Sequence, residues 1–357
     1  MSERLRSSAY RRLVGVGGIG SGIFLALEGN HTLGRNESRA GRLLDARDSC
    51  KLHIVAHHVA VLCGARPSGD PFHVVPIGAV GTDEAGRRLL DEMRAAGIDT
   101  AHVREVPDRP TLFSVCFQYP DGSGGNVTTI DSAAATLSEE HVEGSAGLLD
   151  PATIAVAMPE VDLGPRRRLL ELATEAGAFR AASFTSAEVD RARRSGLLSL
   201  LDLLALNEDE AAALAGRALD PADPEPFLGA LGDAVEPGVV VVVTAGAHGA
   251  FARTREGWVH RPALPAEVRS TAGAGDALLA GVLAGIAAGV PLALEGPADG
   301  LRSALDLGVA LAGLSVTSPH TIHPEADLGA VLAFAARAGL APAAPLSEAV
   351  IDPDPRR

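Results

Sequence analysis

Positive charge is scarce in this chain of 357 residues, and Lys51 is its only lysine. The formal net charge is −14 at pH 7, because 45 Asp and Glu outnumber 31 Lys and Arg. A protein of this charge is repelled by nucleic acid and by anionic lipid, so we expect neither as a partner. Since almost every cation is an arginine, no single arginine stands out as a functional choice.

Cysteines, aromatic residues and long apolar runs are also scarce. The three cysteines, Cys50, Cys63 and Cys116, are widely spaced and form no C-x-x-C pair, which is typical of buried thiols in a reducing cytosol. Residues 1–12 are charged and carry no apolar signal segment, and no apolar stretch reaches membrane length. We therefore expect a cytoplasmic protein that does not enter a membrane.

What the chain does contain is an alternation of short apolar runs with helical stretches. Apolar residues make up 46%, with 40 Gly and 23 Pro. The pattern predicts strands at 73–81, 111–119, 126–130, 153–157, 200–206 and 238–244, and helices at 50–64, 83–96 and 165–177. This order predicts an α/β fold with a doubly wound, mostly parallel sheet that binds ligands at the carboxyl ends of its strands. The Pro-rich residues 341–357 are expected to form a loose tail.

The most informative stretch is 270–289, where small residues precede a long apolar helix. Gly273, Ala274 and Gly275 let the backbone approach a ligand, so that several N–H groups can point at one anion. Asp276 follows in the first helical turn, where a carboxylate is favoured. A carboxylate beside an anion cradle suits phosphoryl transfer, with Asp276 as general base. The alternative is a Gly-rich helix start with an Asp cap.

Two other patterns allow different interpretations. Gly15-x-Gly17-x-x-Gly20 has the spacing of a dinucleotide-binding turn, but the helix that should follow it is interrupted at Gly29. His53 and His57 are four residues apart and could bind a metal from one helical face, although no third ligand is evident. Buried histidines are the main alternative. The polar residues 28–39 are read either as a ligand-binding loop or as a solvated one.

Several motifs, in this order, resemble the PfkB/ribokinase family of sugar and nucleoside kinases. Residues 270–281 are similar to its Asp-Thr-Thr-Gly-Ala-Gly-Asp signature, and 207–210 match its Asn-x-x-Glu. Residues 239–249 resemble its strand and Thr-x-Gly-x-x-Gly turn, and 77–86 its Gly-x-Val-Gly-x-Asp-x-x-Gly. The resemblance implies a ribokinase-like kinase domain over 1–340, with a small β lid from elements near 20–45 and 108–132, and a homodimer formed through that lid.

The resemblance also implies roles for individual residues. ATP would donate its γ-phosphoryl group to a hydroxyl of a small sugar-like acceptor, with Asp276 as base. Gly273, Ala274 and Gly275 would form the anion hole, Thr244, Gly246, Gly249 and Asn207 would bind the nucleotide, and Glu210 with Asn207 would hold Mg²⁺ through water. The other interpretation is a catalytically silent nucleotide-binding protein of the same fold, but such a protein would not need the Asp276 base.

The acceptor half departs from the family pattern. The acid expected at the end of the first strand is missing from 20–22, and Ser270 replaces the first Asp of the signature, which leaves a bound monovalent cation in question. Asn30, Arg35, His57 and His58 come from the segments at the family's acceptor-binding positions. These donors predict an acceptor that bears a phosphate or carboxylate or is rich in carbonyl oxygens, with a neutral polyol or nucleoside as the alternative.

Overall fold

The structure is a computed structural model that describes residues 3–121, 124–296 and 299–351. Its centre is a sheet with the strand order β15-β14-β13-β12-β11-β10-β2-β6-β7. The strands from β7 to β13 in this order run parallel to one another. β14 pairs antiparallel with β13, and β15 pairs antiparallel with β14. Their bounds are β2 Arg12–Val16, β6 His73–Gly81, β7 Val103–Val106, β10 Thr153–Ala157, β11 Phe179–Ser183, β12 Leu203–Asn207, β13 Val240–Thr244, β14 Ala250–Arg253 and β15 Trp258–Arg261.

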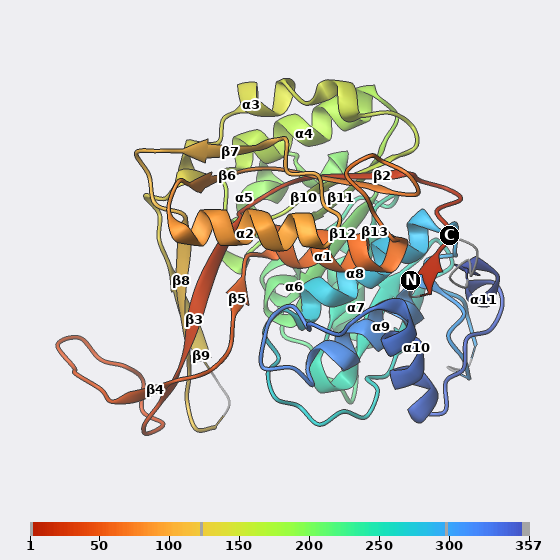
Figure 1. Cartoon of the computed structure of the whole chain (residues 1–357). Helices are drawn as coiled ribbons and strands as arrows, with labels where there is room; N and C mark the ends of the chain where they lie inside the picture. Colours follow the sequence, from red (N-terminus) through yellow and green to blue (C-terminus); the bar gives the residue numbers. More distant parts are fainter. Residues whose placement is uncertain (1–2, 122–123, 297–298, 352–357) are drawn as a thin grey trace.

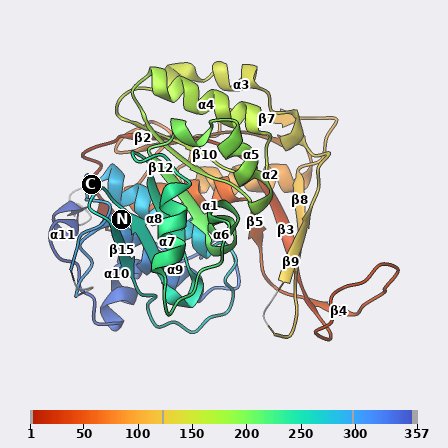
Figure 2. The same ribbon diagram turned by 180° about the vertical axis from the view of Figure 1, so that it is seen from behind.

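Helices cover both faces of this sheet (Figures 1 and 2). One face packs against α1 Lys51–Cys63, α2 Glu84–Ala95, α8 Ala274–Ala287, α9 Ala304–Ser315 and α10 Leu328–Arg337. The other face packs against α4 Leu163–Glu175, α5 Ser186–Arg194, α6 Glu208–Ala215 and α7 Glu225–Asp233, with α3 Glu139–Glu143 beside α4. Successive strand residues alternate between these cores, as Val242 and Val243 do. The predicted doubly wound, mostly parallel sheet is confirmed.

A second sheet forms the lid, which projects from one side of the body (Figure 1). It consists of β3 Gly20–Leu27, β4 Gly41–Leu43, β5 Asp48–Ser49, β8 Leu112–Gln118 and β9 Gly124–Thr128. β3 pairs in parallel with β8, and β8 forms a hairpin with β9. The predicted β lid, separate from the main sheet, is confirmed.

An arm of residues 28–40 extends from the lid between β3 and β4 and stands away from the body in Figure 1. Glu37 holds it together, because its carboxylate accepts hydrogen bonds from the Gly34 amide and the Arg39 guanidinium. These contacts hold the pKa of Glu37 at about 2. The arm is therefore an internally hydrogen-bonded extension of the lid.

The end of the chain differs from the expected loose tail. Leu346–Ala349 forms α11, and β16 Val350–Ile351 pairs antiparallel with β1 Arg4–Leu5. Leu346 is fully buried, so an apolar anchor within the Pro-rich composition fixes this segment. Residues 352–357 lie outside the described part of the chain. In the described ranges no helix is both long and apolar enough to span a bilayer.

The dinucleotide-binding interpretation of the first glycines is not supported by the fold. Gly15 lies in β2 and Gly20 begins β3, so a strand follows the turn instead of a helix. A Cβ at Gly15 would lie 2.5 Å from a Leu52 methyl group, and one at Gly17 would lie 2.8 Å from the Met158 Cβ. These glycines allow α1 and the end of β10 to pack closely.

Candidate active site

The N-terminus of α8 begins at the residues that the sequence singles out. Gly273 caps the helix with φ of 79°, and a Cβ there would lie 2.7 Å from the Thr321 carbonyl oxygen, so this position requires glycine. Asp276 lies in the first turn and is 8% exposed. Burial raises the pKa of the Asp276 carboxyl, and the ammonium of Lys51 opposes this shift. The helix start thus offers free N–H groups beside a buried carboxylate.

The Asn207–Glu210 pair lies at the carboxyl end of β12. Asn207 Oδ1 accepts a hydrogen bond from the Glu210 amide, and Glu210 Oε2 accepts one from the Asn207 amide, both at 2.8 Å. This reciprocal capping box fixes the start of α6. Asn207 and Glu210 therefore have a structural role as a helix cap, and both also line the pocket described next.

A pocket of about 800 Å³ connects these elements. It is lined by every residue expected to bind the nucleotide or form the anion hole, namely Asn207, Thr244, Gly246, Gly249, Gly273, Ala274 and Gly275, together with Asp276 and Glu210. Part of its lining is apolar and includes Leu264, Val268, Val309 and Val316. A cavity that combines an apolar lining with a helix N-terminus suits a nucleotide base and its phosphates.

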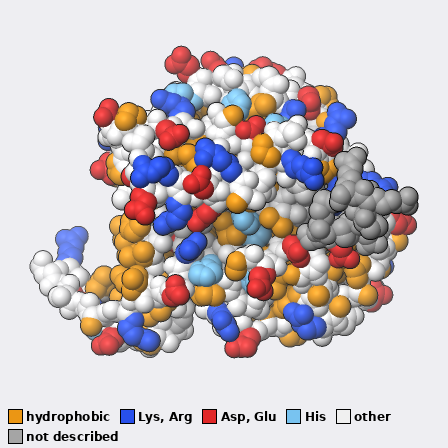
Figure 3. All heavy atoms as spheres, in the orientation of Figure 1, with side chains coloured by type: hydrophobic (Ala, Val, Ile, Leu, Met, Phe, Trp, Pro, Cys, Tyr) orange, Lys and Arg blue, Asp and Glu red, His pale blue; other side chains and the backbone are white. Residues whose placement is uncertain are grey.

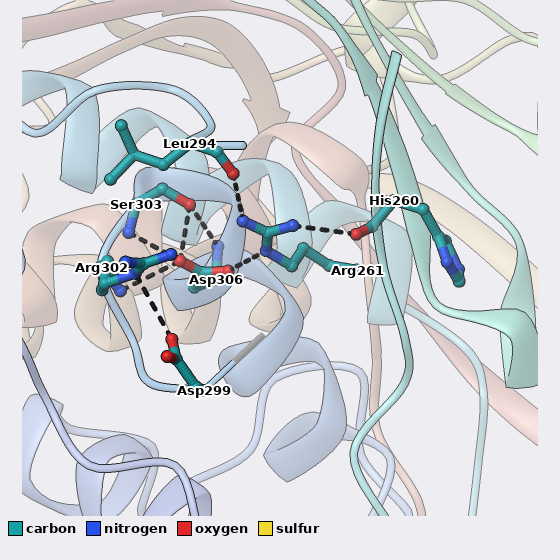
Figure 4. A network of polar contacts seen from close by, with 7 residues as sticks. All are labelled: His260, Arg261, Leu294, Asp299, Arg302, Ser303 and Asp306. Atoms are coloured by element: carbon teal, nitrogen blue, oxygen red, sulfur yellow. Dashed lines mark hydrogen bonds and ion pairs between the residues drawn. The ribbon is translucent and has the colours of Figure 1, made fainter. Parts of the chain in front are cut away.

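A buried ion pair supports the apolar wall of this pocket (Figure 4). Arg261, at the end of β15, donates from Nε to Asp306 Oδ1 at 2.5 Å and from Nη2 to the Leu294 carbonyl. Asp306 also accepts from the Ser303 amide and hydroxyl, each at 2.7 Å. The network ties β15 to the first turn of α9. It thereby fixes the chain that continues into 263–268, part of which lines the pocket.

Lys51 is a candidate site residue that the sequence motifs did not indicate. It is the first residue of α1, it lines the pocket, and its Nζ lies 3.7 Å from Asp276 Oδ2. Asp276, followed by Glu210 and Glu160, raises the pKa of Lys51, so its ammonium stays charged. The sequence offered one indication of it, which is that no other lysine occurs in the chain.

Glu160 anchors the start of α1 beside Lys51. Its Oε2 accepts a hydrogen bond from the Lys51 amide at 3.1 Å, and its backbone adopts a left-handed φ of 74°. Burial raises the pKa of Glu160 to about 7, although Lys51 opposes this. Glu160 lies three residues after the end of β10. A left-handed backbone is unfavourable for a non-glycine residue, so contacts with the surrounding structure must stabilise this conformation.

The four expected acceptor residues do not come together at the pocket. Asn30 and Arg35 lie exposed on the arm, where Asn30 Oδ1 accepts a hydrogen bond from the Asp121 amide. His58 is fully buried in α1 and both of its ring nitrogens lack a hydrogen-bond partner, whereas His57 is half-buried. Burial lowers the pKa of His57 to about 4 and that of His58 to about 3. Neither histidine lines the pocket.

The residues present fit a metal that is bound mainly by the nucleotide. Within the described ranges, no group of three or more His, Cys, Asp and Glu is placed to hold a metal, so a His53–His57 centre is not formed. Mg²⁺ normally takes one or two protein carboxylates and completes its shell with phosphates and water. Glu210, whose pKa is raised by burial, is a pocket carboxylate that can serve in this way.

The chain is similar to known proteins in sequence and in fold. The chain is 29% identical over 257 residues to the bifunctional protein HldE of Bradyrhizobium diazoefficiens. This match covers 66% of this chain and 47% of that protein, so it spans about half of the relative's length. Among solved structures, a ribokinase of Cryptococcus neoformans in complex with ADP superposes with a TM-score of 0.68 at 21% identity, covering 90% of this chain and 98% of that one. A Burkholderia thailandensis nucleoside kinase in complex with inosine gives 0.67 at 19%, covering 92% and 99%. The pattern of the pfkB family carbohydrate kinases matches residues 59–327. The chain belongs to this family.

Proposed function

We propose that the protein transfers the γ-phosphoryl group of ATP to a hydroxyl of a small sugar-like acceptor, with Asp276 as general base. The observation that carries this proposal is the position of Asp276. It lies in the first turn of α8, beside the glycine cradle, and Lys51 Nζ is 3.7 Å away. The kinases that contain ADP and inosine support a nucleotide donor and a hydroxyl acceptor for this fold.

In this mechanism the base of ATP packs against the apolar part of the pocket lining, and its phosphates lie at the N-terminus of α8. Backbone N–H groups at Gly273, Ala274 and Gly275 stabilise charge on the transferring group, and Lys51 contributes a fixed positive charge. Mg²⁺ bound to the phosphates would neutralise part of their charge, with Glu210 and Asn207 holding its water. Asp276 Oδ accepts the proton of the acceptor hydroxyl as that oxygen attacks phosphorus.

A catalytically silent nucleotide-binding protein is the less favoured alternative, because a buried ionised carboxylate costs free energy. Asp276 is buried and its pKa is raised, so keeping it ionised costs free energy that a mere binding protein would avoid. Lys51 offsets this cost from 3.7 Å. A pocket carboxylate whose pKa is raised by burial, with a lysine ammonium beside it, is typical of a functional site.

The test is Asp276→Asn, measured as ADP release and as ATP binding. Asn keeps the shape but cannot accept the proton, so kcat should fall by roughly 10²–10⁴ while the Kd for ATP stays within a small factor. Asp91→Asn, on the exposed side of α2, is the matched control. Equal turnover by Asp276→Asn and the control would remove the assigned base.

We also propose that two copies associate through the lid. Leu43, Phe113, Val127 and Ile130 are exposed by 66, 37, 68 and 90%, and all belong to the lid or its connections. Figure 3 shows hydrophobic side chains gathered along the lid strands. A contiguous apolar face on a sheet favours a partner surface of the same kind. Val127→Glu should convert a dimer to a monomer in light scattering, and an unchanged mass would reject this interface.

A further inference from the structure

Thr321 covers the outer edge of the lid strand β5. Along its other edge β5 pairs with β3, where Ser21 lies opposite Ser49. The Ser49 amide donates to Thr321 Oγ1 at 2.9 Å, and the Thr321 amide donates to the Arg47 carbonyl at 3.1 Å. The Thr321 hydroxyl donates to the same carbonyl at 3.3 Å. Alternate residues of a strand turn their backbone groups to the same side, so Arg47 and Ser49 both face Thr321.

The same residue lies against the first residue of the anion cradle. A Cβ on Gly273 would lie 2.7 Å from the Thr321 carbonyl oxygen and 3.2 Å from the Thr321 Cα, so the two backbones are in direct contact. Gly273 caps α8, and Asp276 follows in the first turn. Thr321 is 2% exposed and does not itself line the pocket. Because close-packed groups do not move independently, a shift of Thr321 would shift Gly273 as well.

Strand β5 also reaches the start of α8 along the chain. Lys51 lies two residues after Ser49, and its Nζ is 3.7 Å from Asp276 Oδ2. Figure 1 shows β5 between the lid strand β3 and the helices of the body. The lid is therefore linked to the helix cap through Thr321 and to the carboxylate through Lys51. Of these two links, the Thr321 hydroxyl can be removed without a change of charge or of side-chain shape, since valine has the shape of threonine.

We propose that Thr321 is a positioning residue that couples the lid to the anion cradle. The inference rests on the proposed phosphotransferase function and adds how that same site is regulated. Phosphates bound at the cradle restrain Gly273, and the contact with Thr321 extends this restraint to β5. In the other direction, the lid fixes the orientation of the cradle amides during transfer, when a small misplacement of oriented dipoles lowers the rate.

The experiment measures amide hydrogen exchange in β3, which is one strand away from Thr321. In the parent, Mg²⁺-ATP without an acceptor should slow the exchange of residues 20–27 by about 3- to 10-fold, the effect of one hydrogen bond. Thr321→Val leaves the Ser49 amide without its acceptor, so the slowing should fall below about twofold. Thr321→Ser keeps the hydroxyl and should respond as the parent does. The Kd for ATP should stay within a small factor in both variants, because Thr321 does not line the pocket.

Turnover separates a positioning role from a purely structural one. With whichever of D-ribose, D-fructose and inosine the parent phosphorylates, Thr321→Val should lower kcat for ADP release by about 3- to 10-fold at an unchanged KM for ATP, and Thr321→Ser should restore it. Thr317→Val is the matched control, because the Thr317 hydroxyl bonds the Leu314 carbonyl at 2.7 Å at the end of α9.

The two measurements fail separately. The proposal is overturned by a parent whose β3 does not respond to Mg²⁺-ATP, by a Thr321→Val that responds like the control or no longer binds ATP, or by a loss of kcat that Thr321→Ser shares. The exchange measurement needs no acceptor. A parent that binds Mg²⁺-ATP and slows exchange in β3, but releases no ADP with any of the three acceptors, would support the coupling and count against the phosphotransferase function.

Discussion

Replacing Lys51 should shift the pH dependence of the reaction, because Lys51 is the cation that keeps Asp276 ionised. Their charged atoms are 3.7 Å apart, and Lys51 is the leading opponent of the burial that raises the pKa of Asp276. At an effective dielectric constant of about 20, two unit charges at that distance attract by about 4 kcal/mol. Converted at about 1.4 kcal/mol for each pKa unit, Lys51→Met should raise the pKa of Asp276 by up to about 3 units.

The assay is the pH profile of ADP release for the parent, Lys51→Arg and Lys51→Met. A base must be deprotonated, so activity rises with pH through the pKa of Asp276, and in Lys51→Met this rise should move to higher pH. Lys51→Arg retains the positive charge, so its activity should rise with pH over nearly the same range as that of the parent. Circular dichroism at each pH verifies that the fold is retained. If the activity of Lys51→Met rises over the same pH range as that of the parent, even with a lower kcat, the electrostatic role of Lys51 is refuted.

Three further outcomes are expected. Asn207→Ala and Glu210→Ala should raise the Mg²⁺ concentration needed for half-maximal activity, and overlapping magnesium titrations would reduce this pair to a helix cap. Asp306→Asn leaves Arg261 buried beside a neutral partner, so it should raise the KM for ATP more than that for the acceptor, and an equal change in both would argue against a nucleotide-wall role. Burial lowers the pKa values of His53 and His58 from 6.5 to about 3, so the folded protein keeps both rings neutral. Below pH 6.5 the unfolded chain binds protons that the folded protein does not, so the stability of the fold is lost as pH falls. Each should cost about 1.4 kcal/mol per pH unit below 6.5, and His58→Leu should flatten the fall of Tm between pH 6.5 and 5.

The pocket residues at the starts of α6 and α8 could be predicted because their positions depend on local backbone geometry. Gly273 must adopt a positive φ, Asp276 must follow within one helical turn, and Asn207 and Glu210 cap one helix. Each requirement fits within a few consecutive residues, so the sequence displays it directly. The alternation of apolar runs likewise identifies strands such as β13, since burial on both faces demands continuous apolar residues.

The contacts of Asp48 and Lys51 could not be predicted because they join elements distant in sequence. Asp48 lies beside Gly22 through cross-strand pairing, and Lys51 contacts Asp276 where α1 packs against α8. His57 and His58 show the opposite error. Their polarity favoured a ligand role, but His58 is fully buried, His57 is half-buried, and neither lines the pocket. Nothing local to the sequence reveals which face of α1 meets α8.

The charge of the pocket implies that ATP binds together with its metal. Four carboxylates line it, those of Glu208, Asp209, Glu210 and Asp276, against the single ammonium of Lys51. Metal-free ATP carries several negative charges into this lining, and the α8 N-terminus and Lys51 offset only part of them. We therefore expect calorimetric ATP affinity to fall at least tenfold when EDTA replaces Mg²⁺. Adenosine, which carries no phosphate, is the control and should bind equally in both buffers. Equal ATP affinity with and without the metal would mean that the pocket's carboxylates do not face the phosphates, and the assignment of Glu210 to the metal would then be wrong.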